Sequence, residues 1–128
     1  MGEIREFEDL RAWQKARELA QSVEVLVRSG RICRDFRFVD QIRSAAASVM
    51  ANIAEGFERG RQGEFYHFLS VAKGSCGEVR SHLYVALARG YLSNAEFESL
   101  RLQAQCTSRV LGALRNSVRR RLDSARSR

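Results

Sequence analysis

Two pairs of side chains have the types and spacing that could bind a metal ion. Glu64 and His67 lie three residues apart in EFYH, and Glu78 and His82 lie four apart in EVRSH. Four-helix bundles that hold two metals use inward-facing glutamates and a Glu-x-x-His motif on each of two helices. Because the chain has one such motif and two histidines in all, we expect no metal site and interpret both pairs as ordinary surface or helix-interface residues.

Thiol chemistry could come from three cysteines, which are Cys33, Cys76 and Cys106. They are far apart and include no C-x-x-C pair, so neither a disulfide framework nor a zinc site is indicated. His82 lies six residues after Cys76, on a different part of the helix turn, and would be a poor base for it. The chain also lacks a nucleophile elbow, a Walker loop and a dinucleotide-binding glycine pattern. We therefore expect no catalytic residue, no cofactor and no enzymatic activity.

The positive charge of the chain is concentrated at its C-terminal end. Residues 101–128 contain eight arginines against a single acid, Asp123, which gives a net charge of +7 and equals the formal charge of the whole chain. Arginine is well suited to phosphate contacts, and such a cluster indicates nucleic-acid binding. The residues expected to make these contacts are Arg109, Arg115, Arg119, Arg120 and Arg121.

The mode of binding expected from this cluster is contact with the nucleic-acid backbone. No aromatic residue interleaves the arginines, so base stacking and sequence readout should be weak. A different interpretation stays open, in which the arginines are a solvated helix end whose charge complements the helix dipole. Assembly into a ring would multiply the positive field and favour an anionic partner.

A stretch at residues 50–57, MANIAEGF, places polar and small residues where a helix should bury an apolar stripe. Asn52 and Glu55 belong to a polar ridge. Residues 72–81, AKGSCGEVRS, likewise carry small side chains around Ser75. Glycine inside a helix costs about 1 kcal/mol relative to alanine, so close helix contact is a plausible compensation. We expect Asn52, Ser75 and Glu78 to exchange hydrogen bonds across this seam, with close approach allowed by small residues, Gly74 and Gly77 among them.

Two alternatives for the seam remain open. The polar ridge could be a solvated face on which the glycines are merely tolerated. Gly56, which directly follows Glu55, could instead loosen its helix locally.

The elements that must position these side chains are all helices. Proline is absent, glycine occurs nine times, and apolar residues recur at steps of three and four without strand-like alternation. Ser93 and Glu96 form a capping box that marks a helix start. The pattern predicts one all-α domain over residues 1–128, an antiparallel up-and-down four-helix bundle. Its helices are expected at about 8–29, 36–59, 64–89 and 94–122, with a basic C-terminal tail at 119–128.

The surroundings of the protein follow from what the sequence lacks. Its N-terminal residues are charged and show no secretory signal, and no segment approaches the roughly 20 apolar residues of a membrane span. We expect a cytoplasmic protein without membrane contact. An alternative function is a protein assembly scaffold that makes no contact with nucleic acid. Its anchors could be the aromatic residues Trp13, Tyr66, Tyr84 and Tyr91.

Four segments together resemble a known family. They are FEDLRAWQKARELA (7–20), QIRSAAASVMANIAEGFERG (41–60), FYHFLSVAKGSCGEVRSHL (65–83) and ARGYLSNAEFESL (88–100). They closely resemble the four-helix-bundle proteins encoded in intervening sequences of bacterial 23S ribosomal RNA genes, and the resemblance reaches about Val118. It implies a homopentameric ring with no known enzymatic activity and a poorly understood role.

The same resemblance suggests partners and signature positions. Related accessory variability determinant proteins of diversity-generating retroelements are similar pentamers that bind nucleic acid and a reverse transcriptase through basic surfaces. The expected partners are therefore further copies of this chain, RNA or DNA, and a reverse transcriptase if the protein is linked to a retroelement. The signature positions carried onto this chain are Asn52, Glu55, Gly56, Gly74, Ser75 and Glu78, which the resemblance makes structural.

Overall fold

A computed structural model describes residues 2–127 and confirms that the chain is all-helical. Within these residues there are four α-helices, two short 3-10 turns and no strand. The 3-10 turns are Phe7–Asp9 and Ile32–Arg34. The helices are α1 (Arg11–Val27), α2 (Phe36–Glu58), α3 (Gln62–Ala88) and α4 (Asn94–Arg126).

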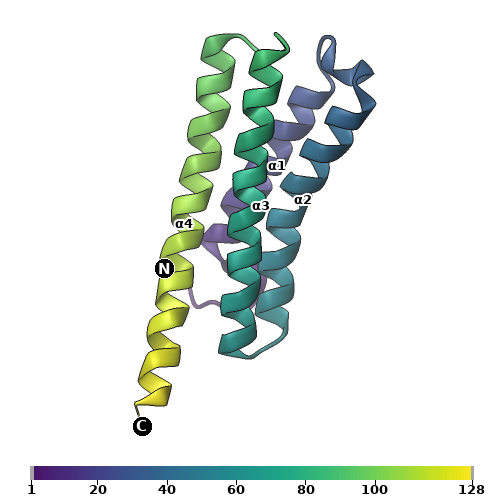
Figure 1. The fold of residues 1–128 in the computed structure, drawn as a ribbon. Coiled ribbons are helices and arrows are strands. Elements are labelled where there is room, and N and C mark those ends of the chain that lie inside the picture. Colours follow the sequence, from purple (N-terminus) through teal and green to yellow (C-terminus); the bar gives the residue numbers. More distant parts are fainter. Residues whose placement is uncertain (1, 128) are drawn as a thin grey trace.

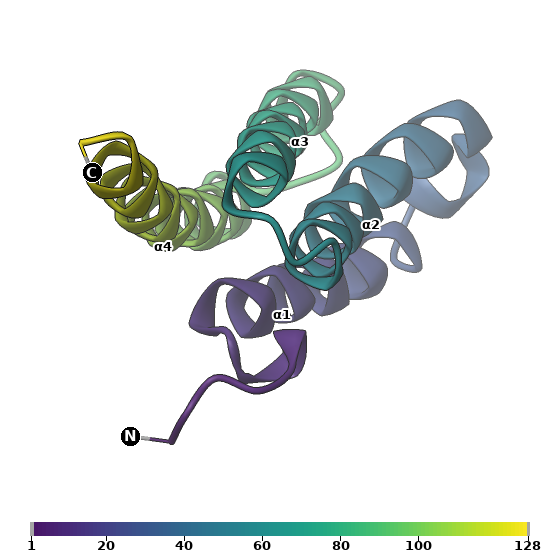
Figure 2. The same ribbon diagram turned by 90° about the horizontal axis from the view of Figure 1, so that it is seen from below.

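The four helices run alternately up and down around one hydrophobic core. Helix α3 lies between α2 and α4, while α1 packs against α2 and α4 from the other side (Figures 1 and 2). All four helices contribute fully buried side chains, because each repeats apolar residues at steps of three and four. Representative fully buried residues are Leu19, Ile42, Val49, Leu69, Leu83 and Leu111.

The first helix is shorter than predicted and begins at Arg11. Asp9 accepts hydrogen bonds from the backbone N–H groups of Arg5 and Glu6, each at 3.0 Å. These bonds close a separate 3-10 turn over Phe7–Asp9 and leave Leu10 in an extended conformation before α1. Local side-chain bonding to the backbone has therefore replaced the first turn that periodicity predicted.

The last helix is longer than predicted and ends at Arg126 rather than near residue 122. The expected basic tail at residues 119–128 is therefore helical as far as Arg126. In Figure 1 this end of α4 projects beyond the turn that joins α2 to α3. No proline or glycine interrupts residues 113–127, so the helix has no local reason to end earlier.

Helix ends are set by side chains that the sequence identifies. The predicted capping box is confirmed: the Ser93 hydroxyl accepts from the Glu96 N–H at 3.1 Å, and the Glu96 carboxylate accepts from the Ser93 N–H at 2.9 Å. Asp35 caps α2 by accepting from the Phe38 N–H at 3.3 Å. Gly90 ends the third helix with a φ of 72°, a conformation that glycine adopts without strain.

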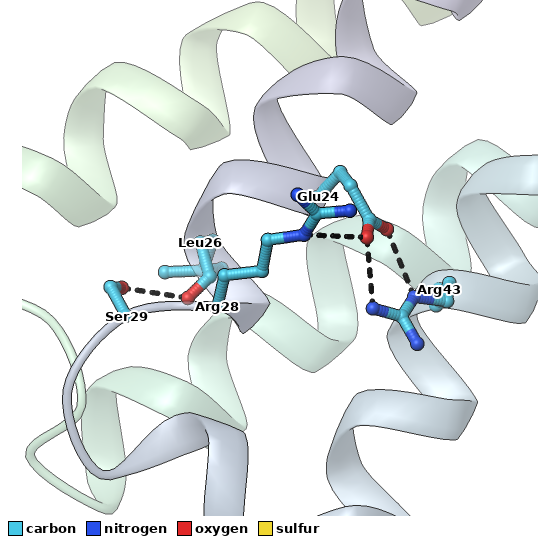
Figure 3. A network of polar contacts seen from close by, with 5 residues as sticks. All are labelled: Glu24, Leu26, Arg28, Ser29 and Arg43. Atoms are coloured by element: carbon cyan, nitrogen blue, oxygen red, sulfur yellow. Dashed lines mark hydrogen bonds and ion pairs between the residues drawn. The ribbon is translucent and has the colours of Figure 1, made fainter.

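An exposed ion pair ties α1 to α2. Arg43 donates two hydrogen bonds to the Glu24 carboxylate, both at 2.9 Å, and Arg28 donates a third at 3.2 Å (Figure 3). The Arg43 hydrogen bond is the main reason why the pKa of Glu24 lies below its ordinary value. Ser29 accompanies this network by donating to the Leu26 carbonyl at 2.7 Å at the end of α1. Solvent-exposed pairs of this kind contribute little to stability, so most of the stability of the bundle comes from its hydrophobic core.

Over residues 2–127, no helix combines the length and the apolar character that a membrane crossing requires.

Candidate nucleic-acid interface

The contact between α2 and α3 contains a short polar network. The hydroxyl groups of Ser48 and Ser75 are 2.9 Å apart, and the Asn52 amide donates to the Ser48 hydroxyl at 2.9 Å and to its carbonyl at 2.8 Å. Ser75 is buried, whereas Ser48 and Asn52 are half-buried. The chain of bonds satisfies the polar groups that the seam encloses, as buried polar groups require.

Four residues predicted for this seam lie outside it. Glu55, Gly74, Gly77 and Glu78 are all exposed, and Glu55 pairs instead with Arg59 of its own helix at 2.8 Å. A Cβ added at Gly74 or Gly77 would meet no atom within 4 Å. Each helical residue is rotated by about 100° from the one before it. Ser75 therefore points toward α2 while the glycines beside it do not, and nothing in the structure explains the glycine at position 74.

The residue that does permit close approach is Gly56. It is buried, and a Cβ at this position would lie 2.7 Å from Phe68 Cβ and 3.1 Å from Phe65 Cδ1 of α3. Such distances leave no room for a methyl group. The helix continues unbroken through Gly56 to Glu58, so the alternative in which Gly56 loosens it is wrong.

The five predicted phosphate-binding arginines all lie on α4, but they do not share one face. Arg109 and Arg120 are exposed and 11 residues apart, which places them on the same outer side of the helix. Arg115 and Arg119 point toward α3, where both approach Tyr66. Arg121 faces a third direction and lines a surface depression with Ile4, Phe57 and Phe65, among other residues.

A line of cations follows the contact between α3 and α4. We call it the basic strip, and its members are Arg80 and Lys73 of α3 and Arg115 and Arg119 of α4. Lys73 donates to the Ser108 hydroxyl at 2.9 Å, and Arg115 donates to the Ser70 hydroxyl at 3.4 Å. These bonds cross between the helices, so both helices hold the strip in place.

Tyr66 organises one end of the basic strip. Arg119 donates to its hydroxyl at 3.1 Å. The guanidinium carbons of Arg115 and Arg119 lie 5.7 Å and 5.5 Å from the centre of its ring, within the range of cation–π attraction. One aromatic side chain therefore holds two positive groups close together.

The α3 members of the strip were missed in the sequence, although a signal was present. Tyr66, Ser70, Lys73, Gly77, Arg80 and Tyr84 are separated by alternating steps of four and three. Such steps place residues on one side of a helix. This polar side runs through a helix that otherwise reads as apolar, and it faces α4. No aromatic residue lies among the arginines in the sequence, but Tyr66 of the preceding helix lies beside two of them in the structure.

The candidate metal and thiol residues are dispersed. Over residues 2–127, no three His, Cys, Asp or Glu side chains are grouped as metal ligands would be. Glu64 pairs with Arg59 at 3.5 Å, and His82 packs edge-on against Phe38. Cys76 is buried and donates to the Ala104 carbonyl at 3.1 Å, and burial raises the pKa of its thiol to about 11. A thiol with that pKa stays protonated and unreactive near neutral pH.

Most of the aromatic residues considered as protein anchors are engaged within the fold. Trp13 packs against Phe7, and Tyr91 donates to Asp35 at 2.6 Å. Trp13, Tyr66 and Tyr91 are half-buried, whereas Tyr84 is 55% exposed. A large aromatic contact surface therefore does not form from these four residues in the single chain.

Comparison with known proteins agrees with the fold and gives no activity. The fold is similar to the crystal structure of a protein of unknown function from the S23 ribosomal protein family of Bacteroides thetaiotaomicron VPI-5482. The TM-score is 0.72 at 20% identity, over 80% of this chain and 96% of that one. No curated protein matches. Residues 8–113 match the model of a family described as 23S rRNA-intervening sequence protein. The chain therefore belongs to the 23S rRNA-intervening sequence protein family.

Proposed function

We propose that this protein is a non-enzymatic, nucleic-acid-binding helical bundle that contacts the phosphate backbone of RNA or DNA through the basic surface of α4. The observation that carries the proposal is the net charge of +7 within residues 101–128. Seven of the eight arginines in that range lie on helix α4, which continues as far as Arg126. Neutralising phosphates releases counterions, which supplies most of the free energy of non-specific binding.

The distribution of the arginines favours backbone contact over base readout. Specific readout needs side chains that reach base edges from one element set into a groove. Here the arginines point in three directions around α4 and the aromatic ring among them, Tyr66, is engaged by Arg115 and Arg119. Sequence preference should therefore be weak.

A salt titration tests this function. Binding of mixed-sequence RNA and DNA should weaken steeply as salt increases. Replacing Arg119, Arg120 and Arg121 by serine should reduce the logarithmic slope by about 0.7–0.9 for each of the three that contacts a phosphate. The matched control replaces three exposed arginines elsewhere, Arg11, Arg34 and Arg37, and should change the slope less. Absence of binding at low salt, or equal effects of both triple variants, would refute the proposal. Retention of a protein partner after nuclease treatment, without nucleic-acid binding, would favour the assembly-scaffold alternative.

We further propose that the working form is a homo-oligomer, the pentameric ring that the family resemblance implies. Helix α3 supports this, because apolar side chains occur on its outer side as well as in the core. Val71 and Val85 are 39% and 36% exposed, so both leave apolar side-chain surface in contact with solvent. A second copy of the chain packed against this part of α3 would remove these apolar side chains from water.

A further inference from the structure

Three cations of the basic strip are half-buried and have no acidic partner, whereas the other unpaired cations among residues 2–127 are exposed. Arg43, Arg59 and Arg89 each pair with a carboxylate within 4.0 Å. Over residues 2–127, Lys73, Arg80 and Arg115 have no carboxylate oxygen within that distance, although all three are half-buried. The fourth member, Arg119, has one weak partner, Asp123, at 3.9 Å.

Holding these half-buried cations together without carboxylate partners costs free energy. Half-buried charges of the same sign repel each other more strongly than they would in water. The Nε atoms of Arg80 and Arg115 are buried without a hydrogen-bond partner among the described residues, which adds a desolvation cost. An arrangement that is costly in isolation is expected where a ligand of opposite charge offsets the cost.

The groups beside the strip suit phosphate oxygens. The hydroxyls of Ser108 and Ser70 already orient Lys73 and Arg115, and hydroxyls can also donate to phosphate. Gly112 lies on α4 between Ser108 and Arg115, so no side chain rises there between the two cations. From Ser108 to Arg119 is 11 residues, or about 16 Å of helix, the axial length of about five nucleotides of one duplex strand.

We propose that the basic strip, and not the outer face of α4, is the main contact for the sugar-phosphate backbone of nucleic acid. The inference rests on the proposed function and adds α3 to the binding surface. Lys73 and Arg115 bind phosphate on either side of Gly112, and Arg119 binds a neighbouring phosphate. Tyr66 is a positioning residue that orients Arg115 and Arg119 and makes no contact with the bases.

Two matched double variants test the strip. Fluorescence anisotropy would measure binding of labelled single-stranded and duplex 20-mers of mixed sequence, at about 50 and 200 mM salt. Lys73→Gln with Arg115→Gln should weaken binding at least about tenfold at low salt and reduce the logarithmic salt slope by about 1.4–1.8. Arg109→Gln with Arg120→Gln removes the same charge from the outer face and should weaken binding less than about threefold. Comparing the two oligonucleotides shows whether the strip binds the backbone of a single strand or of a duplex.

The outcomes separate this inference from the proposed function. If wild type binds but the outer-face variant loses as much affinity as the strip variant, the strip inference is wrong and the function stands. If wild type binds neither oligonucleotide, the function itself fails. The charge-preserving exchange Lys73→Arg with Arg115→Lys should retain binding within about threefold, and circular dichroism should show that each variant is folded. Displacement of the oligonucleotide by an equal charge of poly-glutamate would assign the strip to an acidic protein and overturn the inference.

Tyr66 offers a second, independent test of the strip. Tyr66→Phe keeps the ring under both guanidinium groups and should bind within about threefold of wild type, because the ring and not the hydroxyl holds them. Tyr66→Leu releases both arginines without removing a charge. We expect it to weaken binding several-fold while the salt slope stays unchanged, a combination that loss of folding would not produce. Equal affinities of the phenylalanine and leucine variants would contradict a positioning role.

Discussion

At the scale of single residues, Gly56 shows how one absent side chain permits a helix contact. Helices α2 and α3 meet there so closely that even a methyl group would collide with Phe68 Cβ. A Cβ atom is fixed to the backbone, so neither helix can relieve the collision by changing a rotamer. The glycine is therefore a requirement of this contact, in contrast to the exposed Gly77.

A pair of glycine-to-alanine substitutions tests this distinction. Gly56→Ala should lower the free energy of unfolding by about 1–3 kcal/mol, as overpacking of a core contact does. Gly77→Ala is the matched control in the neighbouring helix and should raise it by about 0.5–1 kcal/mol, because alanine favours the helix and meets no atom. Urea denaturation of both variants measures the two changes. A Gly56→Ala protein as stable as wild type would show that α2 and α3 separate easily.

The residue scale is also where sequence reasoning was least reliable. Asn52, Ser75 and Gly56 do lie at the contact of α2 with α3, but Gly74, Gly77, Glu55 and Glu78 do not. A run of small residues shows that neighbouring helices could approach closely, but it does not show on which side of the helix they lie. That direction depends on where the neighbouring helices lie, which is a property of the tertiary structure.

At the scale of elements, two connecting segments are clasped together at one end of the bundle. Asp35, which caps α2, accepts hydrogen bonds from the Tyr91 hydroxyl at 2.6 Å and from Arg89 at 2.7 Å. Arg31 donates to the Gly90 carbonyl at 3.1 Å and lies over the Tyr91 ring. These contacts, which we call the clasp, attach the connection from α1 to α2 to the connection from α3 to α4.

The clasp should make stability depend on pH through Asp35. The Tyr91 hydrogen bond, followed by the Phe38 N–H and Arg89, holds the pKa of Asp35 below its ordinary value of 3.8, against an opposing effect of burial. A lowered pKa means that the stabilisation is present above pH 3.8 and is lost as the pH falls through the pKa of the folded state. Asp35→Asn keeps a capping side chain but removes the charge.

Urea denaturation across this pH range checks the expectation. Asp35→Asn should be less stable than wild type near neutral pH, and the difference should shrink as the pH falls below about 3.8, the ordinary value for Asp35. Tyr91→Phe is the control that removes the donor and leaves the carboxylate in place. It should destabilise the protein while preserving part of the acid transition. A constant difference between Asp35→Asn and wild type at every pH would contradict the charge-based clasp.

The elements themselves could largely be predicted from the sequence. The periodicity of apolar residues, the absence of proline and the capping box at Ser93 are local signals, and local signals determine where helices form. The errors lie at the ends of two helices. Asp9 closes a separate turn before α1, and α4 continues to Arg126 without a terminating residue. The clasp could not be predicted, because it joins residues 54 and 56 positions apart.

At the scale of the whole molecule, the exposed apolar side of α3 is the surface on which assembly is proposed. Val71→Glu with Val85→Glu places charge on that side without touching the core. We expect this double variant to shift the protein from an oligomer to a monomer, as measured by light scattering, because an unpaired charge buried in an interface is strongly unfavourable. The control is Val25→Glu on α1, where the valine is 72% exposed and its replacement should leave the mass unchanged. A wild-type monomer at all concentrations would end the proposal of a ring.

The candidate site illustrates what is predictable at this scale. The sequence alone locates the positive charge in the last 28 residues, and seven of the eight arginines there lie on α4. Its division among three directions, and the contribution of Lys73 and Tyr66 from α3, arise only when two antiparallel helices pack side by side. Pairing of that kind depends on the fold and is invisible to a scan along the chain.

Helix α4 continues unbroken past residue 113, where the family match ends. The directions in which its later arginines point therefore depend on the number of residues that precede them in the helix. Inserting or deleting one residue between Gly112 and Arg115 would swing every later arginine by about 100° around the helix axis, whereas a change of seven residues would nearly restore their bearings. Lineages that lengthen or trim this extension could therefore redirect its charge without altering a single arginine.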